Sequence, residues 1–287
     1  MTRLTFGSLF AGIGGFDLGF ERAGMRCLWQ VEKDPYCQKV LAKHWPDVER
    51  FEDVREVGKH NLTPIDVICG GFPCQPHSLA GKRKGAEDDR DLWPEYRRII
   101  AELRPAYVIG ENVPGIRTTI LDQVLSDLEN LVYATATFII PACALDAPHR
   151  RDRVFIVAYS TISNAWQSSK WQRREGFNGR GFNRRRNAEE GELSVAHALR
   201  TGLEGANHTG TIRAGKWSVQ FPEHNGWAVE SGVGRVVDGV PHRVDRLRSL
   251  GNAVVPQVAE FIGRLVVQHY NERKHERRAE SYDNFDR

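Results

Sequence analysis

Apolar and polar positions alternate along the first 160 residues in two different rhythms. Short apolar runs rich in Val, Ile and Phe are typical of buried strands, whereas apolar residues at every third or fourth position predict amphipathic helices. One helix also has start signals, since Asp34 can cap it and Pro35 fits its first turn. The pattern predicts strands at 4–10, 25–32, 64–71, 106–113, 134–140 and 153–159, and helices at 14–24, 35–45, 93–103 and 120–131.

The predicted strands and helices follow one another in the manner of βαβ units. Near-continuous apolar strands separated by helices are typical of a mostly parallel sheet that helices cover on both faces. We therefore predict an α/β fold with a doubly wound, mostly parallel sheet.

This regularity ends near residue 160. The stretch 160–235 is rich in Gly, Asn, Ser, Arg and Trp and shows little periodicity, so we predict a second, irregular region there. Regular structure resumes near 236 with an amphipathic helix at 255–270, and we expect the charged tail after it to fray. The predicted organisation is a first unit at 1–159, an irregular region at 160–235, and a return to the first unit at 236–287.

The composition adds bounds on function. With 40% hydrophobic and 27% charged residues, the chain has the composition of a soluble globular protein. No apolar run approaches the roughly 18 residues of a membrane span, so we expect a cytoplasmic protein without a membrane partner. The net charge of +3 is only mildly basic, so any signal for nucleic-acid binding must come from local clusters.

The cysteines indicate a reducing environment. The five of them form an odd set without a CxxC pair, which argues against a disulfide framework or a zinc site. Four are expected to fill the core, namely Cys27, Cys37, Cys69 and Cys143. The fifth, Cys74, lies in "GGFPCQPHS" where a buried strand ends, so it either fills space or acts as a nucleophile at the mouth of a site.

A glycine-rich turn, "FAGIGGFDLGF", follows the first predicted strand and opens the first helix. Its glycines let the backbone turn tightly and approach a ligand, but the third glycine of a dinucleotide fingerprint is missing. This argues against a nicotinamide cofactor and leaves a smaller nucleoside cofactor open. Glu32 ends the second strand about twenty residues on, where an acid can bind ribose hydroxyls. A tight turn beside a surface glutamate explains the same residues equally well.

Polar side chains gather where later strands begin or end. Cys74 follows one strand, and Glu111 and Asn112 close the next. Ligands of an open α/β sheet bind outside the carboxyl ends of its strands, so these groups are on the correct edge. Arg151 and Arg153 stand at the start of the strand 153–159, and we expect them to reach the site from the neighbouring loop.

Taken in order, these motifs resemble those of the cytosine-C5 DNA methyltransferases, in particular short, phage-type members. "FAGIGGF" is similar to the cofactor loop, "FEDV" to the adenine-binding motif and "GGFPCQPHS" to the nucleophile loop. "ENV", "HRRDR" and "GNAVVP" are similar to the base-binding strand end, the arginine motif and the closing motif. The resemblance extends over about 1–160 and 240–270, and it implies a Rossmann-like methyltransferase fold.

The resemblance also implies an activity, DNA (cytosine-5-)-methylation with S-adenosyl-L-methionine as methyl donor. The Cys74 thiolate would add to C6 of a flipped cytosine and make C5 reactive. Glu111 would donate a proton or hydrogen bond to the ring, and Arg153 and Arg151 would complete the catalytic set. Double-stranded DNA would be the partner of a monomeric enzyme.

Further residues take roles from the matched motifs. Substrate contacts are implied for Gln75, Ser78, Asn112 and Val113. Cofactor contacts are implied for Phe10, Gly12, Ile13, Gly14, Gly15, Glu32, Asp53, Val54, Pro73, Leu92, Asn252 and Val254. No metal is implied.

The irregular region combines basic and aromatic residues, a composition that suits contact with nucleic acid. It is the candidate target-recognition region, although a flexible, solvated loop explains the same composition. Methylation of RNA, as in a tRNA-acting branch of the family, and a non-catalytic DNA-binding relative remain alternatives, with a nicotinamide oxidoreductase a distant third. Within the irregular region, the arginines that are candidates for contact with DNA are Arg173, Arg174, Arg180, Arg184, Arg185, Arg186 and Arg213.

Overall fold

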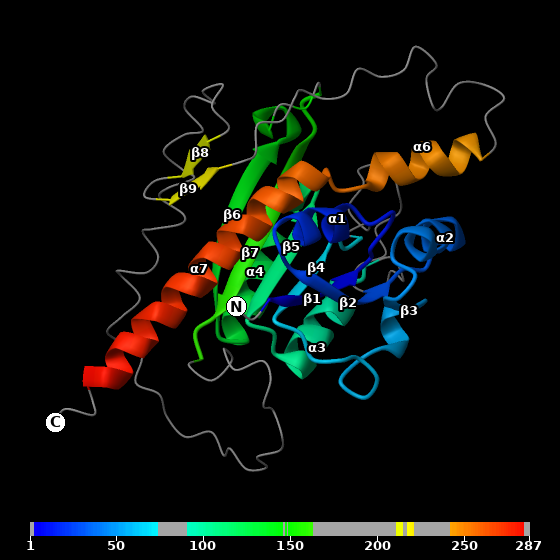
Figure 1. Cartoon of the computed structure of the whole chain (residues 1–287). Helices are drawn as coiled ribbons and strands as arrows, with labels where there is room; N and C mark the ends of the chain where they lie inside the picture. The colour runs from blue at the N-terminus through cyan, green and yellow to red at the C-terminus, as the bar shows by residue number, and fades with distance from the viewer. Residues whose placement is uncertain are drawn as a thin grey trace.

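A seven-stranded sheet forms the centre of the molecule (Figure 1). The structure, a computed structural model, describes residues 3–73, 91–145, 147, 149–162, 211–214, 217–220 and 242–283. The strand order is β3-β2-β1-β4-β5-β7-β6. The strands are β1 (Thr5–Leu9), β2 (Arg26–Val31), β3 (Glu49–Phe51), β4 (Val67–Gly70), β5 (Tyr107–Asn112), β6 (Tyr133–Pro141) and β7 (Asp152–Ser160).

The sheet confirms the predicted doubly wound, mostly parallel arrangement. Strands β3, β2, β1, β4 and β5 pair in parallel, and β7 runs antiparallel between β5 and β6. The strand order reverses between β1 and β4, and ligands of such sheets bind at the carboxyl ends on either side of this point. The turn after β1 and the segment after β4 therefore lie where a site is expected.

Helices cover both faces of the sheet, because each face is a continuous apolar surface (Figure 1). Helices α1 and α7 pack together on one face, and α3 and α4 pack on the other. Asp34 caps α2 as predicted, since its carboxylate accepts the backbone N–H groups of Tyr36 and Cys37. The bounds of these helices are α1 (Gly15–Arg22), α2 (Pro35–His44), α3 (Trp93–Leu103), α4 (Leu121–Asn130) and α7 (Pro256–Asp283), and short 3₁₀ turns lie at η1 (Val54–Glu56), η2 (Pro114–Thr118) and η3 (Ala142–Leu145).

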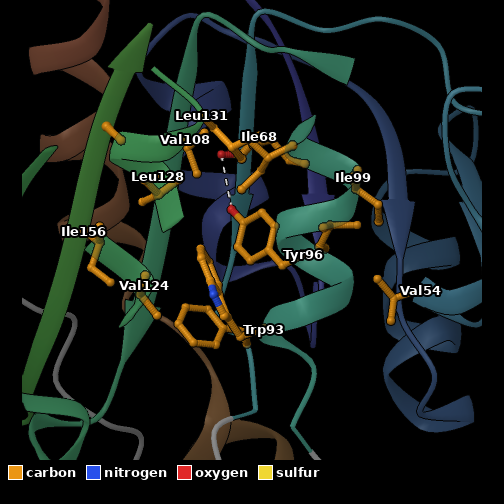
Figure 2. Packing of buried hydrophobic residues seen from close by; sticks show 14 of the residues in the cluster. Val54, Ile68, Trp93, Tyr96, Ile99, Val108, Val124, Leu128, Leu131 and Ile156 are labelled. Atoms are coloured by element: carbon orange, nitrogen blue, oxygen red, sulfur yellow. Dashed lines mark hydrogen bonds between the residues drawn. The ribbon is translucent and has the colours of Figure 1, made fainter. Parts of the chain in front are cut away.

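The core under α3 and α4 is built around two large aromatic side chains (Figure 2). Trp93 and Tyr96 of α3 are buried, with ring centroids 5.8 Å apart. The Tyr96 hydroxyl lies 3.1 Å from the carbonyl oxygen of Ile109 and 3.5 Å from that of Ile68. Because those carbonyls belong to β5 and β4, Tyr96 fixes α3 to the strands that carry the site.

Two features differ from the sequence-based expectation, and a hairpin and a helix after residue 160 were not predicted. The charged tail continues α7 as far as Asp283, because the helical pattern of its first half propagates into the polar second half. Cys143 is exposed, whereas Cys27, Cys37 and Cys69 are buried as predicted. The region 160–235 contains a hairpin, β8 (Thr211–Ala214) with β9 (Trp217–Gln220), and a further helix, α6 (Arg243–Asn252), precedes α7.

One helical stretch of the described chain, 243–275, is long and apolar enough to cross a membrane by length and composition alone. In its α7 part, Val258, Phe261 and Ile262 are buried against the sheet and α1, whereas Val244, Leu247 and Leu250 of α6 are exposed. The α7 part has the arrangement of a core helix that packs on one face of a sheet.

Candidate active site

The turn after β1 forms the first half of the site. Gly12 and Gly14 have φ values of 57° and 86°, a left-handed conformation that favours glycine. The carboxylate of Glu32 holds this turn to the end of β2, because it accepts the N–H of Gly12 and the N–H of Asp34, both at 2.7 Å. A carboxylate has about four acceptor positions, so Glu32 retains capacity for the hydroxyls of a ribose.

A second acid stands beside this turn. Asp53 caps the 3₁₀ turn η1 and forms an ion pair with Lys33 at 3.0 Å. Its hydrogen bond to the Arg55 backbone N–H, aided by Lys33, lowers the pKa of the carboxyl below its usual value. Asp53 is therefore ionised at neutral pH and can accept hydrogen bonds from an amino group such as that of adenine.

The third acid, Glu111, closes β5. Its side chain is buried, and Oε1 lies 3.0 Å from Nε of Arg153. Burial raises the pKa of Glu111 to about 7, while the charges of Arg153 and Arg151 oppose that rise. A carboxyl group with this pKa is present in both protonation states at neutral pH, which suits a proton donor.

The position of Arg153 corrects an expectation. The arginines were expected to reach in from a loop because they stand at a strand start. Strand β7 is antiparallel, however, so its start lies at the same edge as the carboxyl ends of the parallel strands. Asn112 of β5 pairs with Val154 of β7 in the sheet register, which brings Arg153 directly beside Glu111.

The predicted nucleophile Cys74, together with Gln75 and Ser78, lies outside the described residues. The two ends of its segment are described and meet, since the Leu92 N–H donates to the Pro73 carbonyl at 3.3 Å. Pro73 directly precedes Cys74 in the chain. The hydrogen bond between Pro73 and Leu92 therefore places the two ends of this segment at the sheet edge that carries Glu111.

Asn112 connects β5 to the segment that leads to Cys74. Its Nδ2 donates to the Phe72 carbonyl at 2.9 Å, and its Oδ1 accepts the N–H of Val113 at 2.9 Å. A Cβ at Gly71 would lie 2.9 Å from Oε2 of Glu111, so only glycine fits there without displacing the acid. The predicted contact between Asn112 and a base stays a prediction, and the observed contacts are with the backbone.

The remaining predicted site residues are distributed around these groups. Phe10 has a φ of 52° and packs edge-on against Tyr96, while Ile13 lies half-buried in the glycine turn. Val54 is buried, and Val113 is exposed at the end of β5. The other two belong to the closing segment, which we define as residues 251–256: Asn252 ends α6 and is exposed, and Val254 is half-buried.

Two charged residues near the turn were not identified from the sequence. Arg98 of α3 donates to the carbonyls of Val54 and Val57, at 3.1 and 2.8 Å, and so holds the loop that carries Asp53. Nothing local to Arg98 indicates this role, because these two carbonyls belong to residues more than 40 positions earlier in the chain. The sequence does contain a sign that Asp17 is unusual, since this charged residue interrupts the apolar face of the helix in "GFDLGF".

Asp17 is fully buried beneath the glycine turn. It accepts hydrogen bonds from Gln30 Nε2 at 2.8 Å, Ser8 Oγ at 3.2 Å and Cys27 Sγ at 3.5 Å. Burial raises its pKa to about 6, although these hydrogen bonds oppose the rise. The network joins α1, β1 and β2 under the turn.

Asp17→Asn should change how stability depends on pH. A raised pKa means that the folded state holds the proton more tightly, so the Asp17 carboxyl makes folding less favourable as pH rises toward 6. Between pH 4.5 and 7.5, wild type should lose about 2 kcal/mol of unfolding free energy relative to Asp17→Asn. Urea unfolding at both pH values measures the difference, with exposed Asp122→Asn as control. An equal gap between wild type and Asp17→Asn at both pH values contradicts the prediction.

The comparisons with known proteins agree with this geometry. The family described as C-5 cytosine-specific DNA methylase matches residues 4–218. The type II methyltransferase M.HhaI of Haemophilus parahaemolyticus is 32% identical over 169 residues, which cover 57% of this chain and 51% of M.HhaI. M.AquIA of Picosynechococcus is 34% identical over 172 residues, covering 52% of this chain and 69% of that protein.

The fold is also found among solved structures. DNMT2 of Spodoptera frugiperda superposes with a TM-score of 0.50 at 20% identity, covering 60% of this chain and 54% of that one. The chain spans about half the length of M.HhaI. Because the family match covers more than half of the chain, the chain belongs to the C-5 cytosine-specific DNA methylase family.

Proposed function

We propose that the protein transfers a methyl group from S-adenosyl-L-methionine to C5 of cytosine in double-stranded DNA. The observation that carries the proposal is the buried Glu111 carboxyl, paired with Arg153 at 3.0 Å and adjoining the segment that leads to Cys74. An acid and a cation at this edge, together with the thiol of the residue that follows Pro73 in the chain, would provide what addition to a pyrimidine ring requires.

The mechanism assigns each group one task. The Cys74 thiolate adds to C6 of the cytosine and forms a covalent bond, which turns C5 into an enamine-like nucleophile. Glu111 in its protonated form donates to N3 as electron density moves into the ring. Arg153 holds the Glu111 carboxyl in place. After methyl transfer, which leaves S-adenosyl-L-homocysteine, the C5 proton passes to a base such as water, N3 returns its proton to Glu111, and the thiolate is eliminated.

The acids near the glycine turn fit the proposed cofactor. Bound S-adenosyl-L-methionine would supply an electrophilic methyl group. Glu32 would bind the ribose hydroxyls through its remaining acceptor positions, and ionised Asp53 would accept from the adenine amino group. The open space beside Gly12, where a Cβ would meet no atom within 4 Å, leaves room for a ligand against the backbone.

The substrate must leave the duplex to react. C6 of a stacked cytosine is inaccessible to a thiolate, so the base flips into the site. We assign the choice of target sequence to residues 160–235, whose arginines supply phosphate and base contacts. Most of the stretch 160–235, including Arg173, Arg174, Arg180, Arg184, Arg185 and Arg186, lies outside the described residues, and Arg213 belongs to β8.

We further propose that the enzyme works as a monomer in the cytoplasm.

Transfer of a radiolabelled methyl group tests the proposal. Purified protein is incubated with labelled S-adenosyl-L-methionine and either mixed-sequence duplex DNA or total tRNA, and the labelled base is identified after digestion. We expect 5-methylcytosine in the DNA only. Label in tRNA would favour the RNA-methylating alternative, and no transfer to either would favour a non-catalytic relative.

Asp53→Asn should weaken cofactor binding while leaving the fold intact. The amide retains an oxygen that can cap η1, but it loses the charge that accepts from adenine. Hydrogen bonds to charged groups contribute about 1.5–3 kcal/mol, so the dissociation constant for S-adenosylhomocysteine should rise about tenfold or more. Calorimetric titration measures it, with exposed Glu52→Gln as a control of equal charge change. Unchanged affinity in Asp53→Asn would remove Asp53 from the cofactor site.

A further inference from the structure

Arg151 binds a part of the chain one hundred residues away. Its Nη2 donates to the carbonyl oxygens of Gly251 and Ala253, both at 2.7 Å. Both acceptors lie in the closing segment, at the junction of α6 and α7. Hydrogen bonds from a charged guanidinium are shorter and stronger than those between neutral groups. Arg151 therefore fastens the loop before β7 to the closing segment.

The closing segment in turn lies against the cofactor turn. A Cβ at Gly15 would overlap the carbonyl oxygen of Val254, so the two backbones are in direct contact. Gly15 is the first residue of α1 and directly follows the left-handed Gly14. Any shift of the closing segment therefore acts on the start of α1 and on the glycine turn.

The same loop carries the residue that pairs with the catalytic acid. Arg153 lies two positions from Arg151 and contacts Glu111 at 3.0 Å. Arg151 does not contact Glu111 through any hydrogen bond that we observe among the described residues, although its charge stabilises the Glu111 carboxylate. The two arginines thus have different partners. Arg153 contacts the Glu111 carboxyl, whereas Arg151 contacts the closing segment.

We propose that Arg151 is a positioning residue for the cofactor side of the site, where it holds the closing segment against the glycine turn. This inference rests on the proposed function, and it separates the two arginines of one motif. Arg153 acts on the cytosine side, whereas Arg151 sets the affinity for the cofactor. The strained backbone of Arg151, with a φ of 40°, is consistent with a residue whose conformation is imposed by such long-range contacts.

The test measures S-adenosylhomocysteine affinity in the full chain without DNA. Arg151→Met keeps the length of the side chain but removes both hydrogen bonds, and it should raise the dissociation constant about tenfold. Arg151→Lys keeps the charge and should have a smaller effect. Arg150→Met is the matched control, because Arg150 is mostly exposed and, within the part of the chain that the structure describes, its side chain pairs with nearby Asp152. Arg153→Met should leave cofactor affinity within about twofold of wild type.

Hydrogen exchange supplies a readout that does not depend on ligand. Arg151→Met should speed amide exchange around 249–256, with β5 and β7 unchanged, and Arg150→Met should not. Wild-type affinity in both Arg151 variants would overturn the proposal, as would an equal loss of affinity in Arg151→Met and Arg153→Met. A wild-type protein that binds no S-adenosylhomocysteine would instead overturn the proposed function, and this role with it.

Discussion

Replacing Cys74 by serine should abolish detectable methyl transfer. A hydroxyl remains protonated at neutral pH and is a far weaker nucleophile than a thiolate, so the addition to C6 fails. We expect the rate to fall by a factor on the order of 10⁴ or more, as for other enzymes that lose their nucleophile. Cofactor affinity should stay near normal, because the acids assigned to the cofactor, Glu32 and Asp53, are unchanged. Label transfer and calorimetric titration measure the two quantities.

The matched control is Cys143→Ser. Cys143 is a free, exposed cysteine to which the mechanism assigns no role, so its loss should leave the rate unchanged. Duplex DNA with 5-fluorocytosine at the target adds a direct test, since fluorine cannot leave as the proton does and the enzyme remains attached to the base. Peptide mapping should place the adduct at Cys74. An adduct at Cys143, or substantial turnover by Cys74→Ser, is incompatible with the mechanism.

Replacing Glu111 by glutamine should lower kcat by about 10²–10⁴-fold, the range associated with a lost general acid. Glutamine can still form a hydrogen bond but cannot deliver a proton. Wild-type kcat should also fall as pH rises through about 7, because the carboxyl, whose pKa is raised by burial, loses its proton there. Glu111→Gln should lack this falling limb. Initial rates from pH 6 to 9 measure both effects.

Two further variants sharpen this test. Arg153→Met removes the nearest positive charge, which now lowers the pKa of Glu111, so the falling limb should move to higher pH. Glu129→Gln changes an exposed carboxyl on α4 and should leave both rate and pH profile unchanged. A wild-type rate in Glu111→Gln would remove Glu111 from the mechanism. A falling limb that persists in Glu111→Gln would assign that ionisation to another group.

The period of the apolar residues was sufficient to predict the six main strands and the helices between them. Strand β3, only three residues long, was not predicted, because so short a pairing carries no periodic signal. The end of α7 was also predicted wrongly. Its second half is mostly charged and polar, and local composition alone does not distinguish a frayed tail from a helix that continues an anchored one.

The candidate site divides in the same way between local and long-range information. The residue types of the site and their order could be predicted, because turns, strand ends and short motifs depend on residues that are neighbours in the sequence. The direction of β7 is not local: it depends on which partners that strand finds in the sheet, and it brings Arg153 beside Glu111.

The sequence by itself thus determined the mostly parallel α/β architecture, the glycine turn and the acids at the strand ends, whereas the place of the Cys74 thiol stays a prediction. Only the tertiary structure decided the raised pKa of Glu111, since burial is a property of the packed sheet. It alone decided the partner of Arg151, whose acceptors are about a hundred residues away in the chain. The physical reason is that periodicity records which face of an element is buried, whereas contacts between distant segments depend on how those faces pack together.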